Sequence, residues 1–275
     1  KAFFGPSSEH VVGIVANGGA IDKKIPFTTP GYGVVGAENA LTGNFNKRGF
    51  LMRVLQAGQG LANNTALREQ HLAGSLTDAD GEPLENLADD FGSNDFVWDI
   101  EGVINFDQDG NPQGVFRDSG DGSATDVPDD FIPGIPGIEG STDQITAEIL
   151  TVVEIPSAGL YRFGFNSDDG FLTTAGNDKA DAVKLGEFSG GRGASTTPFT
   201  VYFESAGDYA MQSLWYEGGG GANLEWFTIE PNKALLNDTA NGGLKTFATK
   251  PSVPALVTSV SPSADATGIN PQADI

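Results

Sequence analysis

Short runs in which apolar and polar positions alternate occupy much of the chain and predict half-buried β-strands. In each run, apolar side chains two positions apart line one face of a strand, and the polar side chains between them line the other. Runs of this kind begin at Phe50, Tyr161, Phe199, Tyr209 and Leu224. Because strand patterns far outnumber helical ones, we predict an all-β protein, an antiparallel β-sandwich with one short helix.

The predicted helix covers residues 64–73, which read NTALREQHLA. Asn63 or Asn64 is a suitable N-cap, because an Asn side chain can accept a hydrogen bond from a free backbone N–H of the first turn. Gly74 follows the last helical position and predicts the end of the helix.

A polar stretch over residues 76–140 is dense in Asp, Gly, Asn and Pro. It is too long for an ordinary loop, so we expect an acidic loop insertion with a few short strands, such as one over residues 96–100. The segments that begin at Asp78 and Asp107 resemble the start of a Ca²⁺-binding loop. Neither has the distal Glu of a full EF-hand loop.

The two ends of the chain differ from its middle. Residues 10–28 predict two strands joined by a Gly-containing turn, and residues 253–275 carry the pattern of an opening strand, which needs a sheet to join. We interpret residues 1–30 as the end of a preceding Ig-like domain and residues 253–275 as the start of a following one. Residues 31–45 and 233–252 are then linkers, and the chain is a segment of a longer protein.

The composition limits the partners and the kinds of metal or redox site that the chain can have. The chain has 275 residues, with 15 Lys and Arg against 37 Asp and Glu, for a net charge of −22. Such a surface repels phosphates and anionic lipids, which makes nucleic acids and membranes poor partners and hard cations good ones. The absence of Cys excludes disulfides, thiolate sites and iron–sulfur clusters, and two His residues leave little for transition metals. No run of 18 apolar residues is present to span a bilayer.

Two phrases stand in a fixed order between residues 143 and 229. The first is DQITAEILTVVEIPSAGLYRFGFNSDDGFLTTAGN and the second is GDYAMQSLWYEGGGGANLEWFTI. This region resembles the PA-fourteen family, the lectin-like β-sandwich domain named after the anthrax protective antigen. The resemblance implies a sandwich of the jelly-roll type over residues 46–232, which encloses the insertion 76–140. Residues 49–58 look like its first core strand.

The resemblance also implies a calcium site. In sugar-binding members of the family, the two residues equivalent to Asp168 and Asp169 are joined by a cis peptide and both coordinate Ca²⁺. Glu217 stands where those members have an Asn ligand, and Gly219 and Gly221 are the expected carbonyl donors. The change to Glu adds a third charge and a longer arm. Glu217 either ligates Ca²⁺ and tightens its binding, or forms hydrogen bonds to the loop and does not ligate the metal.

Side chains near the expected site are candidates for ligand contact. They are Asp168, Asp169, Asn177, Arg192 and Asn223. The alternatives stay open at this point. Two adjacent Asp residues are also common in turns that bind no metal. Arg192 could form a salt bridge to an acidic neighbour. The two Trp residues at positions 215 and 226 suit a core better than a sugar-binding surface.

The sequence contains no nucleophile motif, metalloprotease motif or phosphate loop, so we expect no enzyme activity. It predicts a Ca²⁺-dependent carbohydrate-binding module of a secreted or cell-surface bacterial protein, with a glycan or polysaccharide as its partner. The alternative is a structural repeat of a surface layer, fibre or stalk. In that case Ca²⁺ rigidifies loops, and the terminal Ig-like strands join neighbouring copies into a homopolymer.

Overall fold

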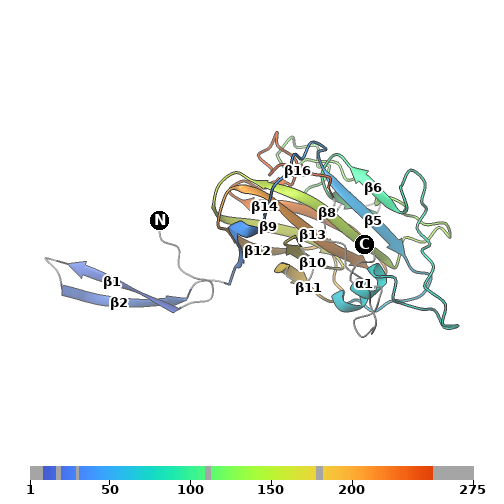
Figure 1. Ribbon diagram of the computed structural model, residues 1–275, viewed down its shortest axis with the longest axis horizontal. Helices are drawn as coiled ribbons and strands as arrows, with labels where there is room; N and C mark the ends of the chain where they lie inside the picture. Colours follow the sequence, from blue (N-terminus) through green and yellow to red (C-terminus); the bar gives the residue numbers. More distant parts are fainter. Residues whose placement is uncertain (1–8, 17–19, 29–30, 109–112, 178–181, 250–275) are drawn as a thin grey trace, which may run out of the picture.

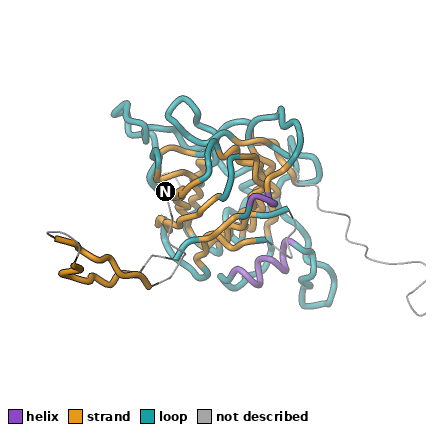
Figure 2. Tube along the Cα trace, turned by 60° about the vertical axis from the view of Figure 1, so that its left-hand side comes forward, coloured by secondary structure: helices purple, strands orange, loops and turns teal. Residues whose placement is uncertain are grey.

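The computed structural model describes residues 9–16, 20–28, 31–108, 113–177 and 182–249. Two sheets face each other across a shared apolar core, which confirms the predicted all-β sandwich (Figure 1). Loops surround the strands, and the helix lies on one side of them (Figure 2). No helix in the described ranges is long and apolar enough to cross a membrane.

The first sheet has eight strands, and six of them form its main path. In order these are β11 (Val183–Phe188), β10 (Gly170–Ala175), β13 (Gly207–Glu217), β8 (Ile145–Ile155), β5 (Phe50–Gln56) and β6 (Val97–Ile100). Two short strands join it at the sides: β4 (Ala40–Leu41) pairs with β13, and β16 (Thr246–Phe247) pairs with β8. All of the pairings are antiparallel.

The second sheet has six strands. Its path is β15 (Ala234–Leu235), β14 (Asn223–Glu230), β9 (Gly159–Asp168), β12 (Ser195–Phe203) and β3 (Gly33–Val35), and β7 (Asn105–Asp107) also pairs with β14. Only the β12–β3 pairing is parallel in this sheet. The predicted pair of strands near the start of the chain is also present. These strands, β1 (Glu9–Ala16) and β2 (Ala20–Thr28), form a separate antiparallel sheet.

Aromatic side chains from both sheets fill the core. Phe165 of the second sheet stacks on Phe171 of the first, with ring centroids 4.3 Å apart. Trp215 and Trp226 are both completely buried and belong to the same core cluster. Their role is therefore packing, as the sequence favoured, because a sugar platform must be exposed.

The helix α1 (Thr65–Leu72) begins as predicted. The Asn64 side chain accepts a hydrogen bond from Leu67 N at 2.8 Å, which caps the first turn. Gly74 has a φ of +65° just after the helix, a conformation that glycine adopts without strain. The helix packs against β8, β13 and β10 on the outer face of the first sheet.

The segments interpreted as linkers are instead partly built into the sheets, which corrects the predicted boundaries. Residues 31–45 contribute β3 and β4, and residues 233–252 contribute β15 and β16. The physical reason is that β8 and β13, with 11 residues each, extend beyond their main neighbours and leave backbone groups that need partners. β16 supplies them for β8 and β4 supplies them for β13, while β3 and β15 extend the second sheet beside β12 and β14.

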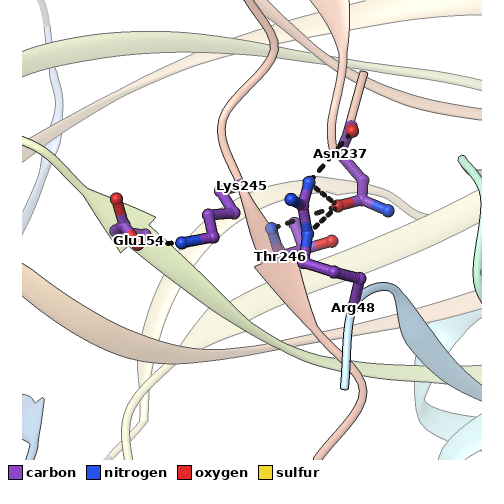
Figure 3. A network of polar contacts seen from close by, with 5 residues as sticks. All are labelled: Arg48, Glu154, Asn237, Lys245 and Thr246. Atoms are coloured by element: carbon purple, nitrogen blue, oxygen red, sulfur yellow. Dashed lines mark hydrogen bonds and ion pairs between the residues drawn. The ribbon is translucent and has the colours of Figure 1, made fainter. Parts of the chain in front are cut away.

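Polar side chains fasten the later of these segments (Figure 3). Arg48 Nε donates to Asn237 Oδ1 at 2.9 Å, and Lys245 Nζ lies 3.0 Å from a carboxylate oxygen of Glu154 on β8. Residues 253–275, interpreted as the start of an Ig-like domain, lie outside the described residues.

The insertion 76–140 is largely packed against the sandwich. It supplies β6 at one edge of the first sheet and β7 beside β14 in the second. Its Phe116 is fully buried against Phe227 on the outer face of the second sheet, with ring centroids 5.1 Å apart. The acidic stretch therefore forms a third layer over part of that face.

Candidate functional site

Asp168 and Asp169 lie between β9 and β10, and the peptide that joins them is cis, as the resemblance implied. Both side chains are nearly buried. The Asp169 carboxylate accepts hydrogen bonds from Asn63 Nδ2 at 2.6 Å, Arg192 N at 2.7 Å and Gly218 N at 2.9 Å. Three segments far apart in the sequence thus fix the orientation of one carboxylate.

Glu217 ends β13 and is completely buried, yet neither of its carboxylate oxygens has a hydrogen-bond partner. Burial raises the pKa of Glu217 to about 8, and the negative charges of Asp143, Asp169 and Asp168 add to the rise. The structure therefore brings Glu217 to the Asp pair, with Asp143 as a further carboxylate nearby.

Arg68 of α1 is the buried cation near these carboxylates. Its guanidinium donates to Ile145 O, Leu61 O and Asn63 Oδ1, each at 3.2 Å. It forms no hydrogen bond to Glu217, whose oxygens are unpartnered. Although its charge lowers the pKa of Glu217, burial and the other carboxylates dominate. The positive charge of Arg68 is thus directed at neutral oxygens and leaves Glu217 unpaired.

The Gly-rich loop 218–222 borders this group of carboxylates. Gly218 O accepts a hydrogen bond from Gln144 Nε2, and Gly220 N donates to Asp143 Oδ1 at 3.3 Å. A Cβ on Gly218 would come within 2.3 Å of Asn63 Oδ1, so a larger residue there would displace the Asn63 side chain. Gly219, Gly220 and Asp143 are exposed and leave this side open to solvent. The roles of the Gly219 and Gly221 carbonyls stay predictions.

The donor set suits a hard divalent cation. A buried carboxylate without a partner is strongly disfavoured unless a positive charge or a proton compensates it. Across the ranges that the structure describes, no three His, Cys, Asp or Glu side chains are grouped closely enough to hold a metal by themselves. Backbone carbonyls would have to complete the shell, and Ca²⁺ accepts such mixed oxygen ligands. Glu217, with two buried unpartnered oxygens, is the side chain that fits such an ion best.

Arg192 braces the turn that carries the Asp pair. Its Nε donates to Ser167 O and Asp169 O, both at 3.1 Å, and its other two nitrogens donate to Thr197 Oγ1 and Ser167 Oγ. The guanidinium also lies over the ring of Phe188, 4.2 Å from its centroid. Its side chain therefore bonds neutral oxygens, where the sequence suggested a salt bridge or a ligand contact.

The other two predicted contact residues lie apart from the open side. Asn223 is completely buried and stands opposite Asp168 in the β14–β9 pairing, below the insertion. Asn177 follows β10, which leads away from Asp169 over six residues, or roughly 20 Å at the usual rise of a strand. The structure thus does not bring Asn177 to the Asp168–Asp169 pair.

Sequence reasoning missed Asp143, Asn63 and Arg68. Asp143 stands two residues before β8, and the antiparallel pairing places Ile145 opposite Glu217. Asp143 could therefore have been found only from the register between β8 and β13, and no local sequence motif indicates that register. Asn63 was considered only as a helix cap, and Arg68 only as one position of the helix.

No family model matches the sequence, and no curated protein sequence matches it. Solved structures similar to this chain include a PA14 domain of the antifreeze protein MpAFP (14 % identity, TM-score 0.43, 74 % of this chain and 92 % of that one). Another is a PA14 sugar-binding domain from an RTX adhesin, with 15 % identity and a TM-score of 0.42; the match covers 70 % of this chain and 96 % of that one. A third is the epithelial adhesin 6 A domain of Candida glabrata in complex with Galb1-3GlcNAc, with 12 % identity and a TM-score of 0.46; the match covers 78 % of this chain and 92 % of that one. The first two are PA14 domains, the domain type that the sequence motifs resemble.

Proposed function

We propose that the sandwich is a Ca²⁺-dependent carbohydrate-binding module of a secreted or cell-surface protein. The observation that carries the proposal is Glu217, a fully buried carboxylate with two unpartnered oxygens, whose pKa is raised by burial and by the charges of three other carboxylates. A cation at this place removes the cost of the unpaired charge.

Asp168, Asp169 and Glu217 would hold the ion, together with carbonyl oxygens of the loop 218–222. Bound Ca²⁺ supplies coordination positions that two vicinal hydroxyls of a sugar can take from water. Asn63, Gly218 and Arg192 keep the Asp169 carboxylate in one orientation. A pre-oriented ligand loses less entropy when the ion binds.

Access for a sugar is expected from the side of Gly219 and Gly220, where the loop is exposed. The order of the two motifs supports sugar binding, because the resemblance is to sugar-binding members of the family. The acidic composition agrees with capture of neutral glycans and opposes binding of polyanions. We expect the module to act in adhesion or polysaccharide capture outside the cell, and not in catalysis.

A glycan array probed in Ca²⁺ and in EDTA tests the proposal on the full chain. We expect binding to some glycans in Ca²⁺, and its loss in EDTA or in the Glu217→Gln variant. Glu101→Gln removes an exposed carboxylate and serves as the matched control. Glycan binding that persists in EDTA would contradict the role of calcium. A protein that binds Ca²⁺ in a calorimetric titration but no glycan on the array would contradict the role in sugar binding.

A further inference from the structure

The outer face of the second sheet carries a row of buried polar side chains under the insertion. β14 lies between β9 and β7, and residues opposite one another in this sheet point to the same face. The members of this polar row are Asn105, Asp107, Asn166, Asp168, Asn223 and Glu225. None of them is more than 8 % exposed. Leu224 and Trp226, which alternate with them on β14, point into the core.

Asp129 of the insertion joins this row from the side. Its segment runs parallel to β7, because Asp107 N donates to Asp130 O and Asp130 N donates to Asn105 O, both at 3.0 Å. Asp130 pairs with the core-facing Phe106, so Asp129 lies on the opposite face, together with Asn105 and Asp107. Both carboxylate oxygens of Asp129 are buried and accept no hydrogen bond of good geometry, although the Asn105 side chain is near enough to lower the pKa of Asp129 as a donor.

The amide side chains of the row also have unpartnered oxygens. Oδ1 of Asn105, Asn166 and Asn223 is buried without a partner in each case. Their nitrogens are occupied: Asn105 Nδ2 donates to Pro128 O at 3.0 Å, and Asn166 Nδ2 donates to Thr196 Oγ1 at 2.9 Å. A buried acceptor without a donor costs about 1–3 kcal/mol. The row therefore concentrates oxygen atoms that lack a donor.

Charge in this region is also unbalanced. Burial raises the pKa of Asp129 to about 6, and the nearby Asp107 raises it further. Burial raises the pKa of Glu225 to about 8, although Val115 N and Phe116 N donate to its carboxylate. The cations that act on these two groups belong to exposed side chains at the rim and offset the effect only in part.

We propose that a divalent cation of the calcium type binds between the polar row and the insertion. Its ligands are the carboxylates of Asp107 and Asp129 and the amide oxygens of Asn105 and Asn223. Two carboxylates with neutral oxygens are a common calcium shell, and the set contains only hard oxygen donors. Such an ion fastens the insertion to the second sheet.

This site adjoins the one at Glu217, because Asp168 stands opposite Asn223, but its two carboxylates are different ones, and it does not rest on the proposed function. The carboxylates that raise the pKa of Glu217 are Asp143, Asp168 and Asp169, and neither Asp107 nor Asp129 is among them. The carboxylates that raise the pKa of Asp129 are Asp107 and Asp130. Asp169→Asn and Asp129→Asn therefore each change a carboxylate that belongs to one set only.

Calorimetric titration of the full chain with Ca²⁺, after removal of metal with EDTA, tests the site. We expect Asp169→Asn, which disables the first site, to retain one ion, and Asp169→Asn with Asp129→Asn to retain none. Asp118→Asn, an exposed carboxylate of the same insertion, is the matched control and is expected to change nothing. Thermal unfolding provides a second measurement: Ca²⁺ should raise the Tm of Asp169→Asn and leave that of the double variant unchanged.

An Asp129→Asn variant that binds as many ions as the parent chain, with unchanged affinity, would overturn the proposal. So would an Asp169→Asn variant that binds no Ca²⁺ while folded by circular dichroism. If Asp129→Asn fails to fold, Asn105→Ala keeps every carboxylate and is expected to weaken the same ion roughly tenfold. Unchanged affinity in a folded Asn105→Ala variant counts against the site as well.

Discussion

Asn63 connects the buried cation to the carboxylates: its Nδ2 donates to Asp169 Oδ2 at 2.6 Å, and its Oδ1 accepts from Arg68 Nη2 at 3.2 Å. One amide thus sets the position of the Asp169 carboxylate relative to a guanidinium that the helix carries. The neighbouring Asn64 caps that helix. Two adjacent residues therefore position the candidate site and the element beside it, by separate contacts.

Replacement of Asn63 by Ala is expected to lower Ca²⁺ affinity by roughly tenfold or more, because the Asp169 carboxylate loses an orienting donor. Calorimetric titration with Ca²⁺ measures the effect. Asn64→Ala is the matched control, since it removes only the cap and should cost about 1 kcal/mol of stability at nearly unchanged affinity. Equal Ca²⁺ affinities for the two variants would show that Asn63 does not position the ligand.

Replacement of Glu217 by Gln should have opposite effects with and without calcium. The raised pKa of about 8 means that folding at pH 7 requires the carboxyl to take up a proton. Relief of this requirement stabilises the variant in EDTA by about 3 kcal/mol. In Ca²⁺ at a thousand times its dissociation constant, the parent chain instead gains about 4 kcal/mol, which reverses the order. Urea unfolding in both buffers measures this, and an unchanged order would contradict it.

Arg192→Lys separates a bracing role from a ligand contact. A Lys ammonium cannot reproduce the planar set of donors that reaches Ser167, Asp169 and Thr197. We expect a loss of about 2 kcal/mol in the free energy of unfolding. In saturating Ca²⁺, glycan affinity of the folded protein should change little. Arg117→Lys, at an exposed position, is the control, and a large loss of glycan affinity without a loss of stability would indicate direct contact.

The sequence predicted the long strands because alternation over five or more positions is a local property. β9, β12, β13 and β14 all lie where the pattern placed them. The strands β3, β4, β15 and β16 have two or three residues each, which is too few for any period to show. Their pairing depends on which backbone groups the long strands leave open. For this reason the predicted linkers were wrong in part.

The same distinction between local patterns and long-range pairing holds for the residues of the candidate site. Asp168 and Asp169 were found because they are adjacent and lie in a motif. Asp143 reaches Glu217 only through the β8–β13 register, which sequence alone did not determine. Asn177 was near the pair in sequence, but the length of β10 takes it away. The role of the insertion as a layer over β14 likewise depended on pairings between distant residues.

His71 provides a prediction for pH. It is 4 % exposed, its Nδ1 lies 2.9 Å from Thr146 Oγ1, and burial together with Arg68 and Arg53 lowers its pKa to about 4. Since the unfolded chain binds the proton more tightly, its stability contribution is present above pH 6.5 and is lost as pH falls to 4. The parent chain should therefore lose about 3 kcal/mol more than His71→Gln over that range, as measured by urea unfolding at several pH values. A difference between the two proteins that stays constant with pH would mean that His71 is not held neutral by the fold.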